Sequence, residues 1–352
     1  MKQLLNLLKK VMINGGLFII IGIFTYRTIF KNTNFQKTVA LVSNGNYKFL
    51  IIGITMICLI LCLEAINIKR NLKLLNENES FLSCLVYTFT GNFFSGITPA
   101  ATGGQPMEIF MMHKRGVSLV NATLSLIMDL AMYQIAVTTI GILAYLRYAN
   151  TIHGLLGHYI WLLWLGIVLN LILLLGLLFA MFSKNFVYYF VEIITKIIMI
   201  FSKAKANNFK LNSISAIKQY KTSSNLFLKH KAYCLINLSI AFVRVILMHS
   251  APFWVYRVLG LNDVSIIEII GFQSMLYISC AVLPFPGGIG IAESNFARFF
   301  KMIFPEELLQ VSMILSRGIG SYITIAISGS IFVATIITNF IIKRSKCLKN
   351  TY

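Results

Sequence analysis

The sequence consists largely of long apolar runs separated by short polar segments. A bilayer core of about 30 Å needs about 20 consecutive apolar residues in a helix. These runs predict an all-α polytopic membrane protein with about six full spans, built as a single transmembrane domain over residues 1–352. The predicted spans are Val11–Ile29, Phe49–Ile66, Leu119–Leu146, Tyr159–Phe182, Ala232–Val258 and Leu308–Ile342. The first run is too long for the apolar part of a signal peptide and is expected to stay as an anchor.

Composition supports a lipid-facing surface. Hydrophobic residues make up 57% of the chain and charged residues 12%, with a mean hydropathy of +0.78, whereas a soluble domain carries about 25% charge. The net charge is +20, an excess that would suggest nucleic-acid binding in a soluble protein. Here 21 of the 31 basic residues can be placed beside the ends of spans on one side, which is the positive-inside pattern. We therefore expect a multi-pass protein of the cell (cytoplasmic) membrane with both termini inside, and no direct nucleic-acid partner. The loop Arg27–Lys48, with four basic residues, opposes this orientation.

Two further apolar stretches, Phe81–Met112 and Ile266–Phe304, are interrupted by Pro and Gly. The assignment of the basic segments to one side of the membrane is consistent only if neither stretch crosses it. Both are therefore predicted to be re-entrant helical hairpins that enter from opposite faces. The basic segment at about residues 184–231 is assigned to the cytoplasm. Within it, Phe186–Phe201 holds Glu192 and Lys196 four residues apart and is expected to be an interfacial helix rather than a span.

The tips of the two hairpins resemble each other. Each tip has a Pro, then a Gly-Gly pair, then a Glu nine residues after that Pro: Pro99, Gly103-Gly104 and Glu108 in the first, and Pro284, Gly287-Gly288 and Glu293 in the second. The pattern favours an inverted repeat whose broken helices meet near the midplane. Pro106 is predicted at the first position of the following helix and Glu108 in its first turn, and Glu293 early in the helix after Gly290.

A half-helix that begins at such a tip presents free backbone N–H groups and a positive dipole end, which suit a phosphate or carboxylate. The plain structural alternative is a tight Gly-Gly turn whose carboxylates only cap the helix.

Several ionisable residues lie at membrane depth. Asp129, Arg244 and Arg317 fall inside apolar segments, where an unpaired charge costs a few kcal/mol or more. Glu64 is expected near a span end, reaching the interface. Asp129 and the arginines either line a polar cavity or pair internally to fix helix packing, with Tyr133, Gln134 and Tyr322 as interhelical hydrogen-bonding partners.

Signatures of other chemistry are missing from the sequence. The six cysteines form no CxxC pair and no zinc-spaced cluster with histidine. No nucleophile elbow and no nucleotide-binding fingerprint occurs in a suitable context. We expect no cofactor, no metal site and no catalytic residue in this chain.

A family resemblance is carried by two stretches and several single positions. They are Ile97–Pro106, Lys114-Arg115-Gly116-Val117, Asp129, Leu283–Ser294, Arg317 and Tyr322. Over almost the whole chain the sequence resembles the membrane (flippase) region of the bacterial lysylphosphatidylglycerol synthase/flippase family. The resemblance implies movement of aminoacylated phosphatidylglycerol between leaflets, which lowers sensitivity to cationic antimicrobial peptides. Full-length relatives add a soluble domain that transfers lysine from lysyl-tRNA. Since the chain stops at Tyr352, we do not expect that synthase activity from it alone.

The first functional hypothesis is thus a lipid translocase (flippase) for aminoacylated phosphatidylglycerol or a related phospholipid. The alternative is an enzyme, phosphatidylglycerol lysyltransferase, or a membrane subunit of one that works with a separate synthase. A third hypothesis is a non-catalytic partner whose basic segment docks a soluble protein or anionic lipid. Glycines such as Gly318, Gly320 and Gly329 permit close helix contacts, within the chain or in a homo-oligomer. The predicted headgroup-binding residues are Gly103, Gly104, Glu108, Asp129, Arg244, Gly287, Gly288, Glu293 and Arg317.

Overall fold

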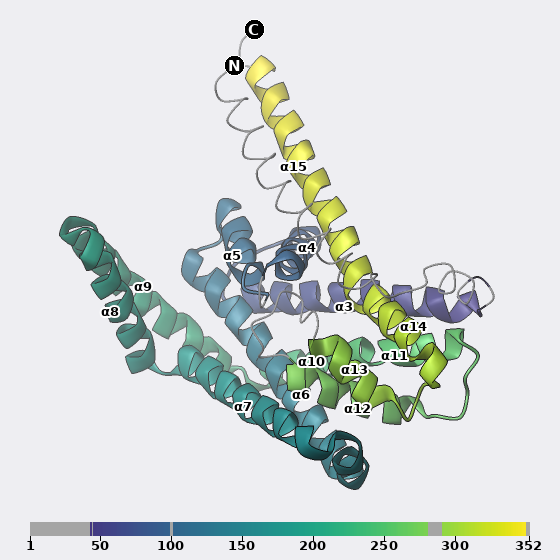
Figure 1. Ribbon diagram of the computed structural model, residues 1–352. Coiled ribbons are helices and arrows are strands. Elements are labelled where there is room, and N and C mark those ends of the chain that lie inside the picture. Colours follow the sequence, from purple (N-terminus) through teal and green to yellow (C-terminus); the bar gives the residue numbers. More distant parts are fainter. Residues whose placement is uncertain (1–42, 44, 99–100, 281–290, 350–352) are drawn as a thin grey trace.

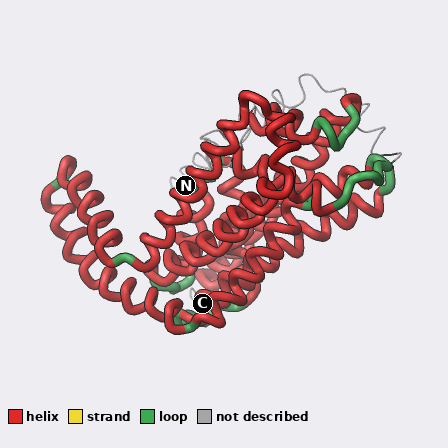
Figure 2. Tube along the Cα trace, turned by 90° about the horizontal axis from the view of Figure 1, so that it is seen from below, coloured by secondary structure: helices red, strands yellow, loops and turns green. Residues whose placement is uncertain are grey.

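The computed structural model describes residues 43, 45–98, 101–280 and 291–349, and all regular structure in this part of the chain is helical (Figures 1 and 2). In Figure 1 the helices form a packed body from which two parts project, the antiparallel pair α8–α9 and the long C-terminal helix α15. The helices are α3 (Tyr47–Leu74), α4 (Phe81–Ile97), α5 (Gly104–Lys114), α6 (Leu119–Leu156), η1 (Gly157–Tyr159), α7 (Ile160–Phe182), α8 (Lys184–Phe201), α9 (Lys203–Lys229), α10 (Lys231–His249), α11 (Ala251–Val258), α12 (Ile266–Cys280), α13 (Ile291–Phe300), α14 (Glu306–Arg317), the π-helical turn η2 (Gly318–Tyr322) and α15 (Ile323–Lys349).

Four helical stretches of the described chain are long and apolar enough to cross a membrane. They are Tyr47–Leu74, Leu119–Phe182, Lys231–Val258 and Glu306–Thr338. They contain the predicted spans from Phe49 onward, except that the last predicted span, Leu308–Ile342, runs past Thr338. The predicted span Val11–Ile29 lies outside the described residues. The third stretch breaks at Ser250, because Pro252 follows at the start of α11 and cannot donate a backbone hydrogen bond to continue α10.

Helix α6 forms the centre of the body. Its first turn is capped by Ser118, whose hydroxyl oxygen accepts from the backbone N–H of Asn121 at 3.1 Å. It packs against α3, α5, α7, α10 and α12. Fully buried side chains of α6, such as Leu124, Met128 and Val137, belong to the largest apolar core, which also includes Phe272 of α12.

The first interrupted stretch folds as two helices, α4 and α5, that pack closely on each other. Ser80 caps α4, and the helix ends at Ile97, just before the Thr-Pro pair. A Cβ at Gly104 would lie 2.7 Å from the carbonyl oxygen of Gly91, so the two backbones approach too closely for any larger residue there. The predicted helix break is present. The prediction that the pair is re-entrant stays a prediction.

The start of α5 differs from the sequence prediction. The helix begins at Gly104, so Pro106 stands at its third position and Glu108 in its second turn, not at the first position and in the first turn as predicted. The reason lies in the preceding loop, where the Thr98 hydroxyl accepts from the N–H of Gly103 at 2.8 Å and draws the chain into helical geometry earlier. Glu108 therefore points back toward α4 instead of capping its own helix.

The second interrupted stretch folds as α12 and α13, and its tip, residues 281–290, lies outside the described residues. Glu293 is the third residue of α13, as predicted. Helix α12 packs against α6 and α7. A Cβ at Gly166 of α7 would overlap the backbone of Ile278, so this contact also depends on a glycine.

The basic segment after α7 is a helical hairpin, α8–α9 (Figure 1). Glu192 and Lys196 form the expected i,i+4 ion pair at 3.2 Å. The hairpin is fixed to the body where the Tyr220 hydroxyl donates to the carbonyl of Ala180 at 2.7 Å, and burial there raises the pKa of Tyr220 to about 12. Helix α8 is not among the four membrane-capable stretches of the described chain, and its interfacial placement stays a prediction.

Candidate functional site

A buried ion-pair cluster joins three of the central helices. Arg244 of α10 donates through Nη1 to both carboxylate oxygens of Asp129 on α6, at 2.8 and 2.9 Å. Its Nη2 lies 2.9 Å from Oε2 of Glu64 on α3. The three side chains are only 6%, 11% and 17% exposed, so the pairs are shielded from water. Of the two alternatives left open by the sequence, internal pairing is present between Asp129 and Arg244.

Glu64 corrects one expectation. It was expected to reach the membrane interface, but it lies inside the bundle against Arg244. The physical reason is that the guanidinium of Arg244 can bind two carboxylates at once. Since a buried carboxylate is costly without a partner, the ion pair with Arg244 stabilises Glu64 inside the bundle.

Side-chain amides surround the ion pairs and hold the carboxylates in place. The Asn67 amide donates to Asp129 Oδ1 at 3.0 Å, and the Asn92 amide lies 3.4 Å from each carboxylate oxygen of Glu64. One turn further along α3, the amide of Asn237 donates to Asn71 at 2.6 Å. These bonds connect α3 with α4, α6 and α10, and they satisfy oxygens that would be costly to bury unpaired.

Glu108 is the fourth ionisable side chain of the cluster. It is 5% exposed, and its carboxyl group lies against Gly91 of α4, where a Cβ would overlap it. Its Oε1 makes no hydrogen bond to the described residues, although it interacts electrostatically with Glu64, Asp129 and Arg244. Gly91 thus provides the space for a carboxyl group whose Oε1 has no hydrogen-bond partner among the described residues.

The cluster is unbalanced in charge. Three carboxyl groups, Glu64, Glu108 and Asp129, share the positive charge of Arg244. Charges removed from water must be compensated, because their mutual repulsion is strong at low dielectric constant. The arrangement is therefore suited to accept a cation or a proton.

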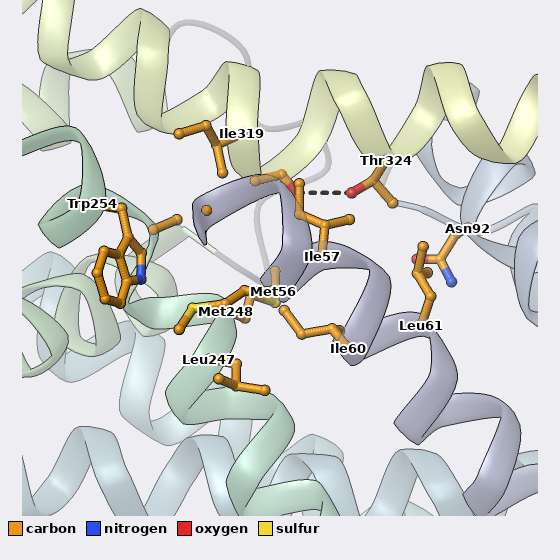
Figure 3. A pocket seen from close by; sticks show the side chains of 13 residues that line it. Met56, Ile57, Ile60, Leu61, Asn92, Leu247, Met248, Trp254, Ile319 and Thr324 are labelled. Carbon is orange, nitrogen blue, oxygen red and sulfur yellow. Dashed lines mark hydrogen bonds between the residues drawn. The ribbon is translucent and has the colours of Figure 1, made fainter. Parts of the chain in front are cut away.

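An apolar pocket of about 70 Å³ borders the cluster. Figure 3 shows side chains of α3, among them Ile57 and Ile60, along the pocket, with Trp254 at one end and Asn92 at the other. Asn92 is also the residue that reaches Glu64. The π-helical turn η2 contributes Ile319 and Gly320 to the wall. Asn92 thus connects the pocket to the ion-pair cluster.

A second polar cluster lies between α6, α7 and α12, and it is neutral. The amide of Gln134 donates to Oδ1 of Asn170 at 2.6 Å, and the Asn170 amide donates to the carbonyl of Gly166 at 2.8 Å and lies 3.3 Å from that of Ile278. Gln134 confirms the expected interhelical role. No charged side chain of the described residues takes part in these bonds.

The remaining predicted site residues are not joined to the charged cluster around Arg244 by any interaction described above. Gly103 and Gly104 stand at the start of α5, one to two turns from Glu108. Arg317 is the last residue of α14, a helix that packs on α11 and α13. Gly287 and Gly288 lie outside the described residues, and Glu293 is placed by its backbone alone. The headgroup-binding roles of all nine predicted residues stay predictions.

A family model for the transmembrane region of lysylphosphatidylglycerol synthase matches residues 12–328. The chain belongs to this family. Its sequence is 26% identical over 325 residues to a UPF0104 membrane protein of Pyrococcus horikoshii, covering 89% of this chain and 95% of that protein. It is 22% identical over 335 residues to a UPF0104 membrane protein of Archaeoglobus fulgidus, covering 94% and 98%. The family and the apolar helices together identify a multi-pass membrane protein.

Three side chains that complete the cluster in this family member were not predicted there from the sequence: Glu64, which was placed at the interface, and Asn67 and Asn92. A signal for the first two was present. Glu64, Asn67 and Asn71 stand at i, i+3 and i+7 within an apolar helix, which places polar groups on one face. Asn92 had no such signal, because its partner is on another helix.

Proposed function

We propose that the chain is a lipid translocase that moves aminoacylated phosphatidylglycerol, or a related phospholipid, across the cytoplasmic membrane. One observation supports this proposal most strongly: a buried cluster with an excess of carboxyl groups borders an apolar pocket inside a membrane protein. An amino headgroup would compensate the excess negative charge, and an acyl chain would occupy apolar surface near Asn92.

The roles of the residues follow from their contacts. Glu108 is the first ligand for the ammonium group, because its Oε1 has no partner among the described residues. Asp129 and Glu64 add negative potential but stay paired with Arg244, which fixes their positions. The headgroup phosphate would lie near Gly103 and Gly104, at the positive dipole end of α5, although the N–H groups of these two glycines already donate to Thr98 and Ala101. Exposing such lipids on the outer surface would contribute to resistance to cationic antimicrobial peptides.

The test uses purified protein in vesicles that contain lysylphosphatidylglycerol. A membrane-impermeant amine reagent labels the lipid in the outer leaflet over time. We expect lipid initially in the inner leaflet to become labelled faster than in protein-free vesicles. Glu108→Gln should slow this at least tenfold, while Glu306→Gln, an exposed carboxyl at the start of α14, serves as the matched control and should behave as wild type.

Equal labelling rates for wild type, Glu108→Gln and protein-free vesicles would contradict the proposal. Extraction of total lipid from a host that lacks aminoacylated lipids separates the enzymatic alternative, since new lysyl-lipid there would indicate synthesis by the chain and its absence would agree with transport.

A further inference from the structure

The excess of carboxyl groups raises a question about the site when it holds no cationic headgroup. With Glu64, Asp129 and Glu108 all ionised, one guanidinium would face three negative charges in the interior of the bundle. Burial of an uncompensated carboxylate costs several kcal/mol in a protein interior. The empty site must therefore bind a positive species of its own.

A metal ion is a poor candidate for that species. Among the described residues, no group of three His, Cys, Asp or Glu side chains is arranged to hold a metal. Glu64 and Asp129 direct their oxygens at Arg244 and at the amides of Asn92 and Asn67. The cluster therefore lacks the converging oxygen ligands that Na⁺, Mg²⁺ or Ca²⁺ would require.

Glu108 is the group best placed to take a proton. Glu64 and Asp129 are each paired with Arg244, whereas Glu108 is buried with no partner for its Oε1 among the described residues and has both carboxyl groups as electrostatic neighbours. The helix packed on it, α4, contributes Gly91 at the contact and the neutral thiol and phenol of Cys84 and Tyr87 further back along the helix.

Three charged groups of other helices in the described chain interact with Glu108: Glu64 of α3, Asp129 of α6 and Arg244 of α10. Arg244 alone favours an ionised Glu108, and both of its Nη groups are already bound to the other two carboxylates. Burial and the two neighbouring carboxyl groups together outweigh Arg244, so Glu108 stays protonated until another cation binds.

We propose that Glu108 is a proton-exchange group: it holds a proton in the empty site and releases it when a cationic headgroup binds. The inference rests on the proposed translocase function and adds a coupling ion to it. The exchange balances charge, since one proton leaves the carboxyl group for water as one ammonium group enters. A lipid carried outward would then be exchanged for a proton carried inward.

The test imposes a pH gradient across vesicles that contain lysylphosphatidylglycerol and follows its distribution between the leaflets. For exchange of one proton per lipid, each pH unit should shift the leaflet ratio at equilibrium by about tenfold, with lipid accumulating on the acidic side. A protonophore should abolish the shift. Glu108→Asp keeps a carboxyl group and should retain the response, and Glu306→Gln should retain it fully. In Glu108→Gln, whatever lipid movement remains should ignore the gradient.

The outcomes separate the two proposals. Lipid movement by wild-type protein that is indifferent to the pH gradient would overturn proton exchange while leaving the translocase in place. A gradient response that survives in Glu108→Gln would overturn the assignment to Glu108. No movement above protein-free vesicles would overturn both. As a check independent of transport, binding of lysylphosphatidylglycerol to the protein in detergent should release about one proton from wild type and none from Glu108→Gln, with phosphatidylglycerol giving no release in either.

Discussion

The two polar clusters of the interior solve the same packing problem in different ways. The neutral cluster of Gln134 and Asn170 pairs its amides with backbone carbonyls and with each other, and it closely joins α6, α7 and α12. The charged cluster around Arg244 joins α3, α6 and α10 but leaves Glu108 with an oxygen that lacks a partner among the described residues. A cluster built only to hold helices together would resemble the first. The difference supports the proposal that the second serves a ligand.

The largest expected effect comes from removing the shared cation. Arg244→Met leaves Glu64 and Asp129 buried and unpaired, which should destabilise the protein by about 3–5 kcal/mol. Thermal unfolding in detergent measures the loss. The triple variant Glu64→Gln, Asp129→Asn, Arg244→Met removes the charges together and should recover most of the stability without recovering transport. If the single and triple variants lost the same stability, the loss in Arg244→Met would not come from unpaired carboxylates.

An intermediate effect is expected where Gly91 makes room for the carboxyl group. In Gly91→Ala the new Cβ overlaps Glu108, so the side chain must move or the α4–α5 contact must open, at about 1–3 kcal/mol. Lipid exposure should fall more than the folded fraction does. Gly176→Ala on α7 is the matched control, because a Cβ there meets no atom of the described chain within 4 Å. Transport equal to that of the control would show that the position of Glu108 does not matter.

A smaller effect on stability, and none on transport, is expected in the neutral cluster. Asn170→Leu removes the partner of Gln134 and should cost about 1–3 kcal/mol, because a buried amide loses its hydrogen bond. The transport rate per folded molecule should stay within twofold of wild type. A selective loss of transport would break the contrast between the two clusters.

The smallest effect belongs to the exposed ion pair of the α8–α9 hairpin. Glu192→Gln removes a pair whose side chains are 42% and 70% exposed, and it should change stability by no more than a few tenths of a kcal/mol. Denaturation of Glu192→Gln beside Arg244→Met measures how strongly burial alone determines the value of an ion pair. A loss comparable to that of Arg244→Met would contradict this explanation.

Much of the architecture could be predicted from the pattern of apolar runs, and part of the cluster from isolated charges. Asp129 and Arg244 were identified because each interrupts an apolar span, and their pairing is confirmed. Glu64 was misplaced because its depth depends on how far α3 extends, to Leu74 rather than Ile66. Asn92 was missed because its partner is on another helix.

Other errors came from side-chain contacts that no local pattern shows. The hydrogen bond from Gly103 to Thr98 sets the start of α5 and turns Glu108 toward α4, whereas the Gly-Pro spacing alone predicted a later start. The lysine-rich segment after α7 was assigned to the cytoplasm by its charge, and nothing in that charge predicted a helical hairpin docked through Tyr220. Charge distribution predicts topology more readily than it predicts packing.

The central claim is that the charged cluster receives a cationic lipid headgroup, and competitive lipid binding tests it directly. Native mass spectrometry of the protein with equal amounts of lysylphosphatidylglycerol and phosphatidylglycerol reports which lipid is retained. We predict that wild type and Glu306→Gln retain lysylphosphatidylglycerol preferentially, and that Glu108→Gln loses this preference by at least fivefold. The same preference in Glu108→Gln as in wild type would contradict the claim.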